Sequence, residues 1–401
     1  MNVDEVLRAT LREQAAEQAS AGPGLADRVV ALQHRRRARR FATVAAVTAA
    51  VVAVAVAVPL LDSGGGDDIR PGGVLRPDEI KARPDQSPPR DQISAGNTVL
   101  AAYATSKFVE RTATSGSTVR TYWLLDQRTG RYVKAPKWSF VAVDPGMRSA
   151  AVLERGLPAS RIGLLDLSTG KVERWIPVDH GVGALAYSPD GRRLVATTYA
   201  GDPDQLVVEG HVWERKAQSD RTGFYVLDVA SGKGSWSEVA PPRVDSLFDA
   251  EEHFAFSNDG TRVWIGVAQG DGEEQYFDLS GTEVPEPRNE RYRKWSIPAG
   301  LSPSGRFAAT DFPGKKWKYS SWVVDTRTGE RTEVQGQQLL AWVGDKQLIA
   351  WGAPDGAVPP GQPLVLLTVG SDKVVPLSGP RPTVVEDDSV WTPVFAQRGP
   401  H

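Results

Sequence analysis

The side chains in this sequence whose types and spacing could do chemistry lie in short runs that mix cations with aromatic rings. Ammonium and guanidinium groups beside indole or phenol rings attract an anionic polymer, a lipid headgroup or a carbohydrate, through charge and stacking. The alternative is that the rings pack inside the fold while the cations face solvent. Lys137 beside Trp138 is a smaller example. The predicted binding residues are Arg291, Tyr292, Arg293, Lys294, Trp295, Lys315, Lys316, Trp317, Lys318 and Tyr319, together with Trp213.

Signals for catalysis or for a bound metal are poor. The segment Gly300–Ser304 misses a Gly-x-Ser-x-Gly pattern by one residue, and neither His-Glu-x-x-His nor a phosphate-binding loop occurs. The five histidines share no metal-ligand spacing, and there is no cysteine to act as nucleophile or ligand. Asp202–Asp204 and Asp271–Glu274 could bind calcium, although acidic loop tips usually bind only water. We therefore predict no enzyme activity, no catalytic residue, no metal and no cofactor.

The composition is typical of a folded body rather than of a disordered tail. Hydrophobic residues make up 40% of the chain and the formal net charge is −2, so there is enough apolar surface to bury a core. The nearly neutral charge argues against nucleic acid as a partner. Because the chain has no cysteine, packing rather than disulfides must hold it together.

An uncharged apolar run, Phe41–Leu61, follows a cluster of arginines. As a helix at about 1.5 Å per residue it would span roughly 31 Å, which matches the hydrocarbon core of a bilayer. Cations mark the cytoplasmic end of a span, so we expect a single-pass protein of the cell membrane with a cytoplasmic N-terminus and an extracytoplasmic C-terminal part. A cleaved secretion signal and a buried core helix are the alternatives. The orienting residues are Arg35, Arg36, Arg37, Arg39 and Arg40.

The segments on either side of this run have different characters. Residues 1–40 show apolar residues at helical spacing on both sides of Gly22-Pro23-Gly24, which predicts two short helices. They could dock on a cytoplasmic partner or serve only as a polar leader. Residues 62–96 are rich in Pro, Gly, Asp and Arg, and we expect an extended tether there.

From about Asn97 to the C-terminus, short apolar runs alternate with turn sequences, which predicts an all-β body. Two kinds of turn recur. One follows the pattern Ser-Pro-Asp-Gly, at Ser188–Gly191, Ser257–Gly260 and Ser302–Gly305, with a looser copy at Asp144–Gly146. The other follows the pattern Asp-x-x-Thr-Gly or a relative of it, at Asp126–Gly130, Asp166–Gly170, Asp228–Gly232 and Asp325–Gly329, with a copy one residue shorter at Asp278–Gly281 and a degenerate sixth at Thr368–Asp372.

These residue types favour tight hairpins, because proline fixes φ, aspartate accepts bonds from nearby backbone N–H groups, and glycine accepts positive φ. Two hairpin turns per repeat mean four strands per repeat, which is typical of a β-propeller blade. The turns resemble those of the TolB-like and WD-repeat propeller families. Counting the Asp-type turns gives six repeats, so we expect a six-bladed β-propeller of four-stranded blades in residues 97–401. The resemblance supports this architecture and says almost nothing about activity.

Together with the apolar run and its arginines, the chain also resembles bacterial single-span propeller proteins. Some of these are encoded beside extracytoplasmic-function sigma factors, so the resemblance implies a sigma factor or another cytoplasmic regulator as a partner. The last apolar segment, Val390–Ala396, has no repeat of its own, and the first repeat lacks its innermost strand. We predict that this segment supplies the missing strand, which would cover an exposed sheet edge.

These features favour a membrane-tethered binding or sensing module over other functions. Its outer body would engage an unknown extracellular ligand, a protein or an anionic polymer, and its N-terminal segment would report to a cytoplasmic regulator. The alternative is a propeller hydrolase or lyase that acts on an extracellular polymer. Long insertions favour one face of the ring for binding, among them the loop predicted for Ala200–Asp220.

Overall fold

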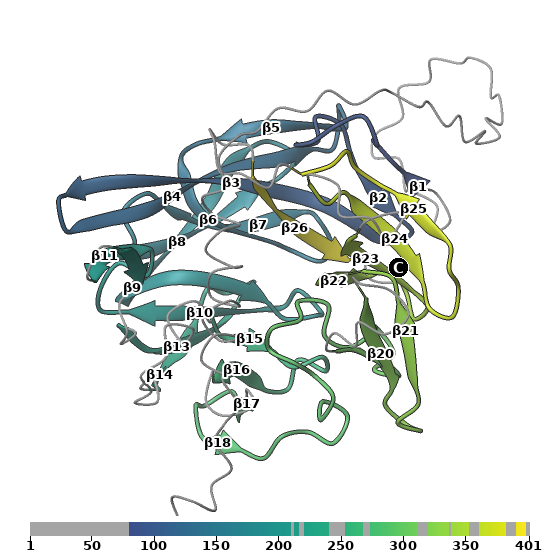
Figure 1. The fold of residues 1–401 in the computed structure, drawn as a ribbon. Coiled ribbons are helices and arrows are strands. Elements are labelled where there is room, and N and C mark those ends of the chain that lie inside the picture. Colours follow the sequence, from purple (N-terminus) through teal and green to yellow (C-terminus); the bar gives the residue numbers. More distant parts are fainter. Residues whose placement is uncertain are drawn as a thin grey trace, which may run out of the picture. The chain divides into compact units, whose positions relative to one another are not determined.

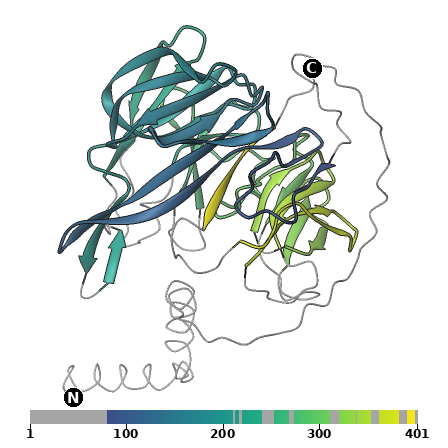
Figure 2. The ribbon, with the colours of Figure 1, turned by 90° about the horizontal axis from the view of Figure 1, so that it is seen from above.

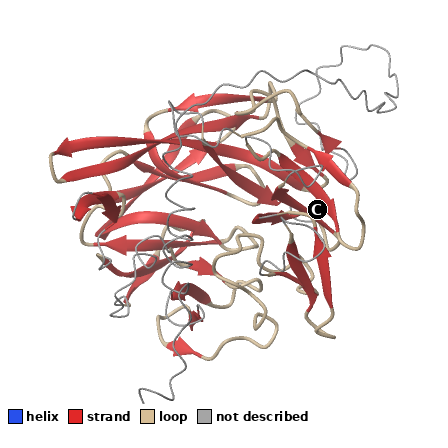
Figure 3. Ribbon diagram, viewed as in Figure 1, coloured by secondary structure: helices blue, strands red, loops and turns tan. Residues whose placement is uncertain are grey.

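The computed structural model describes residues 80–209, 212–215, 220–239, 253–267, 273–310, 320–336, 338–352, 361–381 and 390–397. Within these ranges every regular element is a β-strand (Figure 3), and no helix there is long and apolar enough to cross a membrane. The all-β prediction is therefore confirmed for this part of the chain. The predicted cytoplasmic helices, the apolar run Phe41–Leu61 and the arginines before it lie outside the described residues.

The first sheet pairs strands from distant parts of the chain (Figure 1). Its central meander is antiparallel and contains, in spatial order, β26 (Trp391–Gln397), β3 (Thr98–Thr112), β4 (Ser115–Asp126) and β5 (Arg131–Ala135). Trp391 lies opposite Thr105, and Gln397 lies opposite Thr98. The prediction that the C-terminal segment adds a strand to the first repeat is thus confirmed.

Two further meanders share one sheet because a single long strand belongs to both. The first half of β9 (Lys171–Tyr187) pairs with β8, and its second half pairs with β10. The other strands, in chain order, are β6 (Trp138–Val143), β7 (Ser149–Glu154), β8 (Ala159–Asp166), β10 (Arg193–Tyr199), β13 (Arg221–Asp228) and β14 (Gly234–Glu238).

The C-terminal half of the described chain repeats the same antiparallel order in three smaller sheets. One contains β15 (Ala255–Phe256), β16 (Val263–Val267), β17 (Glu273–Phe277) and β18 (Glu283–Val284). The next contains β19 (Phe307–Ala309), β20 (Ser321–Asp325) and β21 (Arg331–Val334), extended by a bridge from Leu301 to Ala308. The last contains β22 (Gln338–Trp342), β23 (Gln347–Trp351), β24 (Leu364–Thr368) and β25 (Val374–Pro376).

The hydrophobic pattern explains which strands are central. β24 reads Leu-Val-Leu-Leu-Thr, and its first four residues are buried. β10 has six consecutive buried residues after Arg193. Strands that are covered on both faces carry such continuous apolar runs, whereas the outer strand β5 alternates between a buried Tyr132 and an exposed Val133.

The predicted turns close the hairpins. In the Asp-x-x-Thr-Gly type, the Gly170 N–H donates to the Asp166 carbonyl at 2.8 Å, and in the Ser-Pro-Asp-Gly type the Gly191 N–H donates to the Ser188 carbonyl at 2.9 Å. The two glycines have φ of +68° and +70°, values that a residue without Cβ adopts easily. The turn sequences therefore fix where each hairpin reverses.

The folded body extends further toward the N-terminus than the sequence suggested. Residues 80–96, expected as part of the tether, form β1 (Ile80–Lys81) and β2 (Ser94–Ala95), which pair with each other while β2 also pairs with β3. Ile93 is fully buried in the main hydrophobic core. This apolar side chain keeps the segment on the body despite its many prolines.

The insertion Ala200–Asp220, expected as a loop, contains β11 (Gln205–Glu209) and β12 (Val212–Arg215). β11 pairs with the start of β4, where Gln205 lies opposite Ser117, so the insertion extends the first sheet. Figure 2 shows β11 and β12 beside the far end of the long β3–β4 hairpin. An ion pair of 2.5 Å between Arg120 and Asp204 supports this contact.

Candidate functional site

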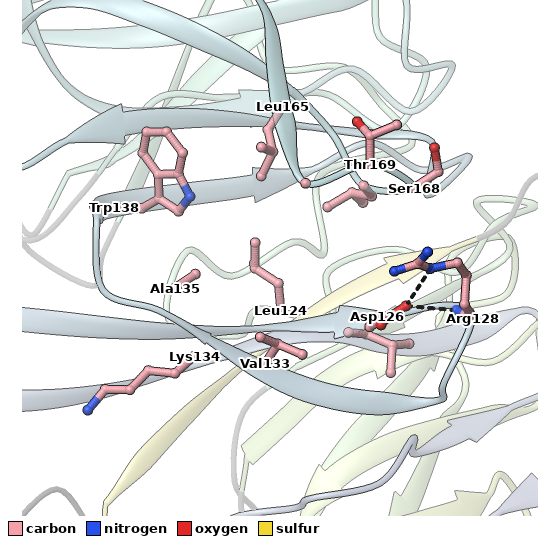
Figure 4. Close-up of a pocket in the computed structure, with 13 residues that line it drawn as sticks. Leu124, Asp126, Arg128, Val133, Lys134, Ala135, Trp138, Leu165, Ser168 and Thr169 are labelled. Carbon is pink, nitrogen blue, oxygen red and sulfur yellow. Dashed lines mark hydrogen bonds and ion pairs between the residues drawn. The ribbon is translucent and has the colours of Figure 1, made fainter.

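A groove lies between the β4–β5 hairpin of the first sheet and the strands β6 and β8 of the next meander (Figure 4). Its volume is about 270 Å³. The hairpin side is formed by Leu124 and Val133, which are cross-strand partners. The opposite side is formed by Leu165 of β8 and by Trp138, the first residue of β6.

The exposure of the groove walls changes sharply across the groove. Leu165 and Trp138 are only 2% and 5% exposed, whereas Val133 is 54% exposed. Val133 is thus a large apolar side chain on an outer strand, at a concave place that solvent reaches. It adds apolar surface to a concave place, and concave apolar sites with a few polar groups are where ligands usually bind.

Two Asp-x-x-Thr-Gly turns form one rim of the groove. The Asp126 carboxylate accepts the Arg128 backbone N–H at 2.9 Å and lies 3.6 Å from the Arg128 guanidinium. Asp166 accepts the backbone N–H of Ser168 at 2.6 Å. The hydrogen bond from the Arg128 backbone lowers the pKa of Asp126, and hydrogen bonds from Ser168 lower the pKa of Asp166. Both carboxylates are therefore ionised near neutral pH, and they hold the two turns in shape.

The groove can hold an apolar group of side-chain size and can bond to the atoms around that group. Ser168 and Thr169 bring hydroxyl groups to the rim, and Arg128 and Lys134 bring cations. The volume is close to the lower end of what small-ligand pockets offer. The geometry therefore suits the recognition of one apolar side chain or substituent with polar neighbours.

The structure places one of the predicted binding residues in the interior. Arg293 is 9% exposed, and its Nε donates to the fully buried carboxylate of Glu290 at 2.6 Å. Its guanidinium also lies 4.7 Å from the centre of the Trp264 ring. The Tyr276 hydroxyl donates to the same carboxylate at 3.2 Å. Arg293 therefore helps to attach the connection between β18 and β19 to the body.

The neighbouring predicted residues have other surroundings. Arg291 is exposed, and its guanidinium lies 4.6 Å from the centre of the Tyr292 ring. Lys294 is half-buried. The Trp295 backbone N–H donates to Glu274 at 2.6 Å, so this residue too is fixed to the body. Arg291 and Tyr292 are the part of the run that keeps a cation and a ring together at the surface.

The other predicted residues are not brought to this place by the described structure. Trp213 lies on β12, where its ring centre is 4.9 Å from that of Phe108 on the β3–β4 hairpin. The run from Lys315 through Lys316, Trp317 and Lys318 to Tyr319 lies outside the described residues. The binding role of all these residues stays a prediction.

No sequence motif marks the groove. Its two walls come from separate hairpins, and no motif joins Val133 to Leu165. The one local signal is the pair Lys137 and Trp138, a cation beside a ring, of which Trp138 lines the groove. The exposure of Val133 depends on which side of β5 the next meander covers, and this packing cannot be predicted from the sequence.

The described fold is an all-β body of antiparallel meanders of the propeller type. No protein-family model matches the sequence, and no curated protein matches it. Solved structures with a similar fold include TolB from Acinetobacter baumannii, at 13% identity and a TM-score of 0.38, over 69% of this chain and 65% of that chain. They also include the β-propeller domain of Cps50 (Swd1) from Myceliophteria thermophila, at 13% identity and a TM-score of 0.37, over 71% of this chain and 87% of that one. Both kinds of propeller that the turn motifs resemble are therefore among the similar structures.

The prediction that the chain is not an enzyme needs correction. Similar structures also include an enzyme, the acylaminoacyl peptidase of Pyrococcus horikoshii, at 13% identity and a TM-score of 0.42, over 75% of this chain and 48% of that chain. The chain spans 65% of TolB and about half of the peptidase, and such distant similarity concerns the fold alone.

Proposed function

We propose that this chain is a membrane-tethered binding module whose groove between the β4–β5 hairpin and strands β6 and β8 receives an extracytoplasmic partner. The observation that supports this most is the exposed Val133 in a concave apolar site, next to buried Trp138 and Leu165. A rigid set of sheets presents the site, and two hydrogen-bonded turns form its rim. A preformed site of this kind binds a partner at a low cost in conformational entropy.

The same proposal includes the arrangement of the whole chain. We assign the six meanders of the described residues, three in the larger sheets and three in the smaller ones, to the six blades of one propeller. The run Phe41–Leu61 anchors the body in the cell membrane, with the arginines before it on the cytoplasmic side. Residues 1–40 report to a sigma factor or another cytoplasmic regulator when the groove is occupied.

A second surface is proposed at Arg291 and Tyr292. The exposed Arg291 cation and the half-buried Tyr292 ring suit an anionic polymer, together with Lys294 and the run Lys315–Tyr319. A ligand on this surface and a partner in the groove would be able to bind the same module at the same time.

Photo-crosslinking in cells tests the groove. A photoreactive phenylalanine analogue at Val133 (54% exposed) should give a discrete covalent adduct with the partner. The matched control is the same analogue at Val109, which is 38% exposed on the β3–β4 hairpin away from the groove residues. An adduct at Val133 that is missing at Val109 supports the proposal. No adduct at Val133, or the same adducts at both positions, contradicts it.

A further inference from the structure

Two tryptophans and a carboxylate beside the groove surround one ammonium group. Lys137 lies in the turn before β6, and its Nζ is 4.8 Å from the ring centre of Trp138 and 5.6 Å from that of Trp175. The two ring centres are 6.3 Å apart, and the ring planes make an angle of 52°. Glu154 Oε1 lies 3.4 Å from the same Nζ. Two indole faces and a carboxylate are the groups that proteins use to hold organic ammonium ions.

The parts of this site are fixed without any help from Lys137. Arg161 donates from Nε and Nη2 to Glu154 Oε2, at 2.9 and 2.6 Å, which leaves Oε1 directed at Lys137. The Trp175 ring lies directly against Gly163, because a Cβ there would come within 2.9 Å of it. Trp138 is buried. If Lys137 left, the rings and the carboxylate would keep their places.

Lys137 is held weakly by comparison. Its side chain is 59% exposed, and cation–π contacts and ion pairs at exposed sites contribute little to stability. A lysine with several rotatable bonds also loses entropy when it is fixed over a ring. An ammonium ion from solution can therefore compete with it.

We propose that Trp138, Trp175 and Glu154 form a binding site for an alkylated ammonium group, and that Lys137 occupies this site in the free protein. Trp138 also lines the groove, so an apolar chain attached to the ammonium would lie against Leu124 and Val133. The site selects a cation because the indole rings and Oε1 of Glu154 are electron-rich, and the Trp175 ring already holds the Arg161 guanidinium 4.1 Å from its centre. Lys137 sets the affinity, since a ligand must displace it.

Calorimetric titration of the full chain in a nonionic detergent tests this proposal. The probes are tetramethylammonium and n-butyltrimethylammonium, at matched ionic strength, and 3,3-dimethyl-1-butanol is a neutral probe of similar shape. Lys137→Ala should raise the affinity for both ammonium probes about three- to tenfold, because it removes the internal competitor. Lys171→Ala, which removes an exposed lysine that makes no ring contact, should leave the affinity unchanged.

Two further variants examine the site itself. Glu154→Gln keeps the shape of the side chain and removes its charge, so it should weaken binding of the ammonium probes to the Lys137→Ala protein at least tenfold. Trp175→Leu should do the same by removing one ring, with a melting curve to confirm that the protein is folded. The proposal is overturned if Lys137→Ala does not bind the ammonium probes more tightly than the unaltered protein, or if the neutral probe binds equally well.

This inference rests on the proposed function, because the substituent on the ammonium is placed in the groove. The two ideas nevertheless fail separately. A missing adduct at Val133 would refute the groove as a partner site. Tighter ammonium binding by Lys137→Ala would still support the cation site. An adduct at Val133 without ammonium binding would support the groove as a partner site and refute the cation site.

Discussion

The indole ring of Trp391 lies 5.6 Å from the phenol ring of Tyr103, with an angle of 64° between the ring planes. Trp391 begins the last strand, and Tyr103 lies in the first long strand, β3. The same indole is 5.0 Å from the ring of Trp351 on β23, and its N–H donates to Ser87 Oγ at 3.0 Å. The C-terminal strand thus connects three separate parts of the body through one side chain.

Replacing Trp391 by alanine should destabilise the protein strongly. Trp391 is fully buried, and removing a large aromatic side chain from a core costs about 3 to 5 kcal/mol, since contacts are lost and a cavity remains. Thr392→Ala, at the next and exposed position of the same strand, should change the free energy of unfolding by less than about 0.5 kcal/mol. Urea denaturation measures both. If both substitutions changed the free energy of unfolding equally, the contacts of the Trp391 ring would contribute little to stability.

Substitutions of Arg293 and Arg291 should have different effects on the free energy of unfolding, although the sequence suggested one binding role for both residues. Arg293→Met leaves the fully buried Glu290 carboxylate without its cation, which should cost about 3 kcal/mol. Arg291→Ala should cost less than about 0.5 kcal/mol, because the guanidinium is exposed. Denaturation curves of the two variants provide the check, and a small effect of Arg293→Met would argue that its ion pair is not formed.

Glu274 should make stability depend on pH between about 4.5 and 7. Burial raises the pKa of Glu274 to about 7, while the unfolded chain keeps a value near 4.5. The folded protein therefore binds the proton more tightly, so the stability from this group is complete below about pH 4.5 and is lost as pH rises to about 7.

Glu274→Gln should remove this pH dependence and still accept the Trp295 N–H. Because part of the carboxylate faces solvent, which screens its charge, we expect the variant to be about 1 kcal/mol more stable than the unaltered protein at pH 8. The two should be equally stable near pH 4. Melting curves across this range decide the matter, and parallel pH profiles for the two proteins would contradict the role of Glu274.

The Asp166 turn should respond to acid in the opposite direction. Hydrogen bonds from Ser168 and Thr169 lower the pKa of Asp166, so its contribution to stability is present above about pH 4 and is lost as pH falls through the folded-state value. Asp166→Asn should be less stable than the unaltered protein at pH 7, and the difference should shrink as the pH falls below about 4. Denaturation at a series of pH values tests this, and a difference that stays constant from pH 7 into acid would mean that the charge is not the cause.

The hairpins could be predicted from the sequence because their signals are local. A turn such as Asp166–Gly170 carries its own acceptor and its own glycine, so four or five residues determine where the chain reverses. The added C-terminal strand could also be predicted, since Val390–Ala396 was an apolar segment without a repeat and the first repeat lacked a strand.

The groove and the buried ion pair could not be predicted, because they depend on contacts between distant residues. Arg293 belongs to a run of cations and rings in the sequence. Its role in holding the fold becomes visible only in the structure, where its guanidinium donates to the buried Glu290 carboxylate. The strands β11 and β12 have a local sequence signal, two apolar runs on either side of Gly210-His211. Which strand they would pair with was not readable from those runs.

Protease treatment of intact protoplasts tests the central claim, a binding body that the run Phe41–Leu61 tethers outside the cell. The chain would carry one tag before Met1 and another after His401. We predict that added protease removes the C-terminal tag while the N-terminal tag stays with the membrane and is protected. A C-terminal tag that survives until the cells are lysed, or a protein found free in the medium, would contradict the account.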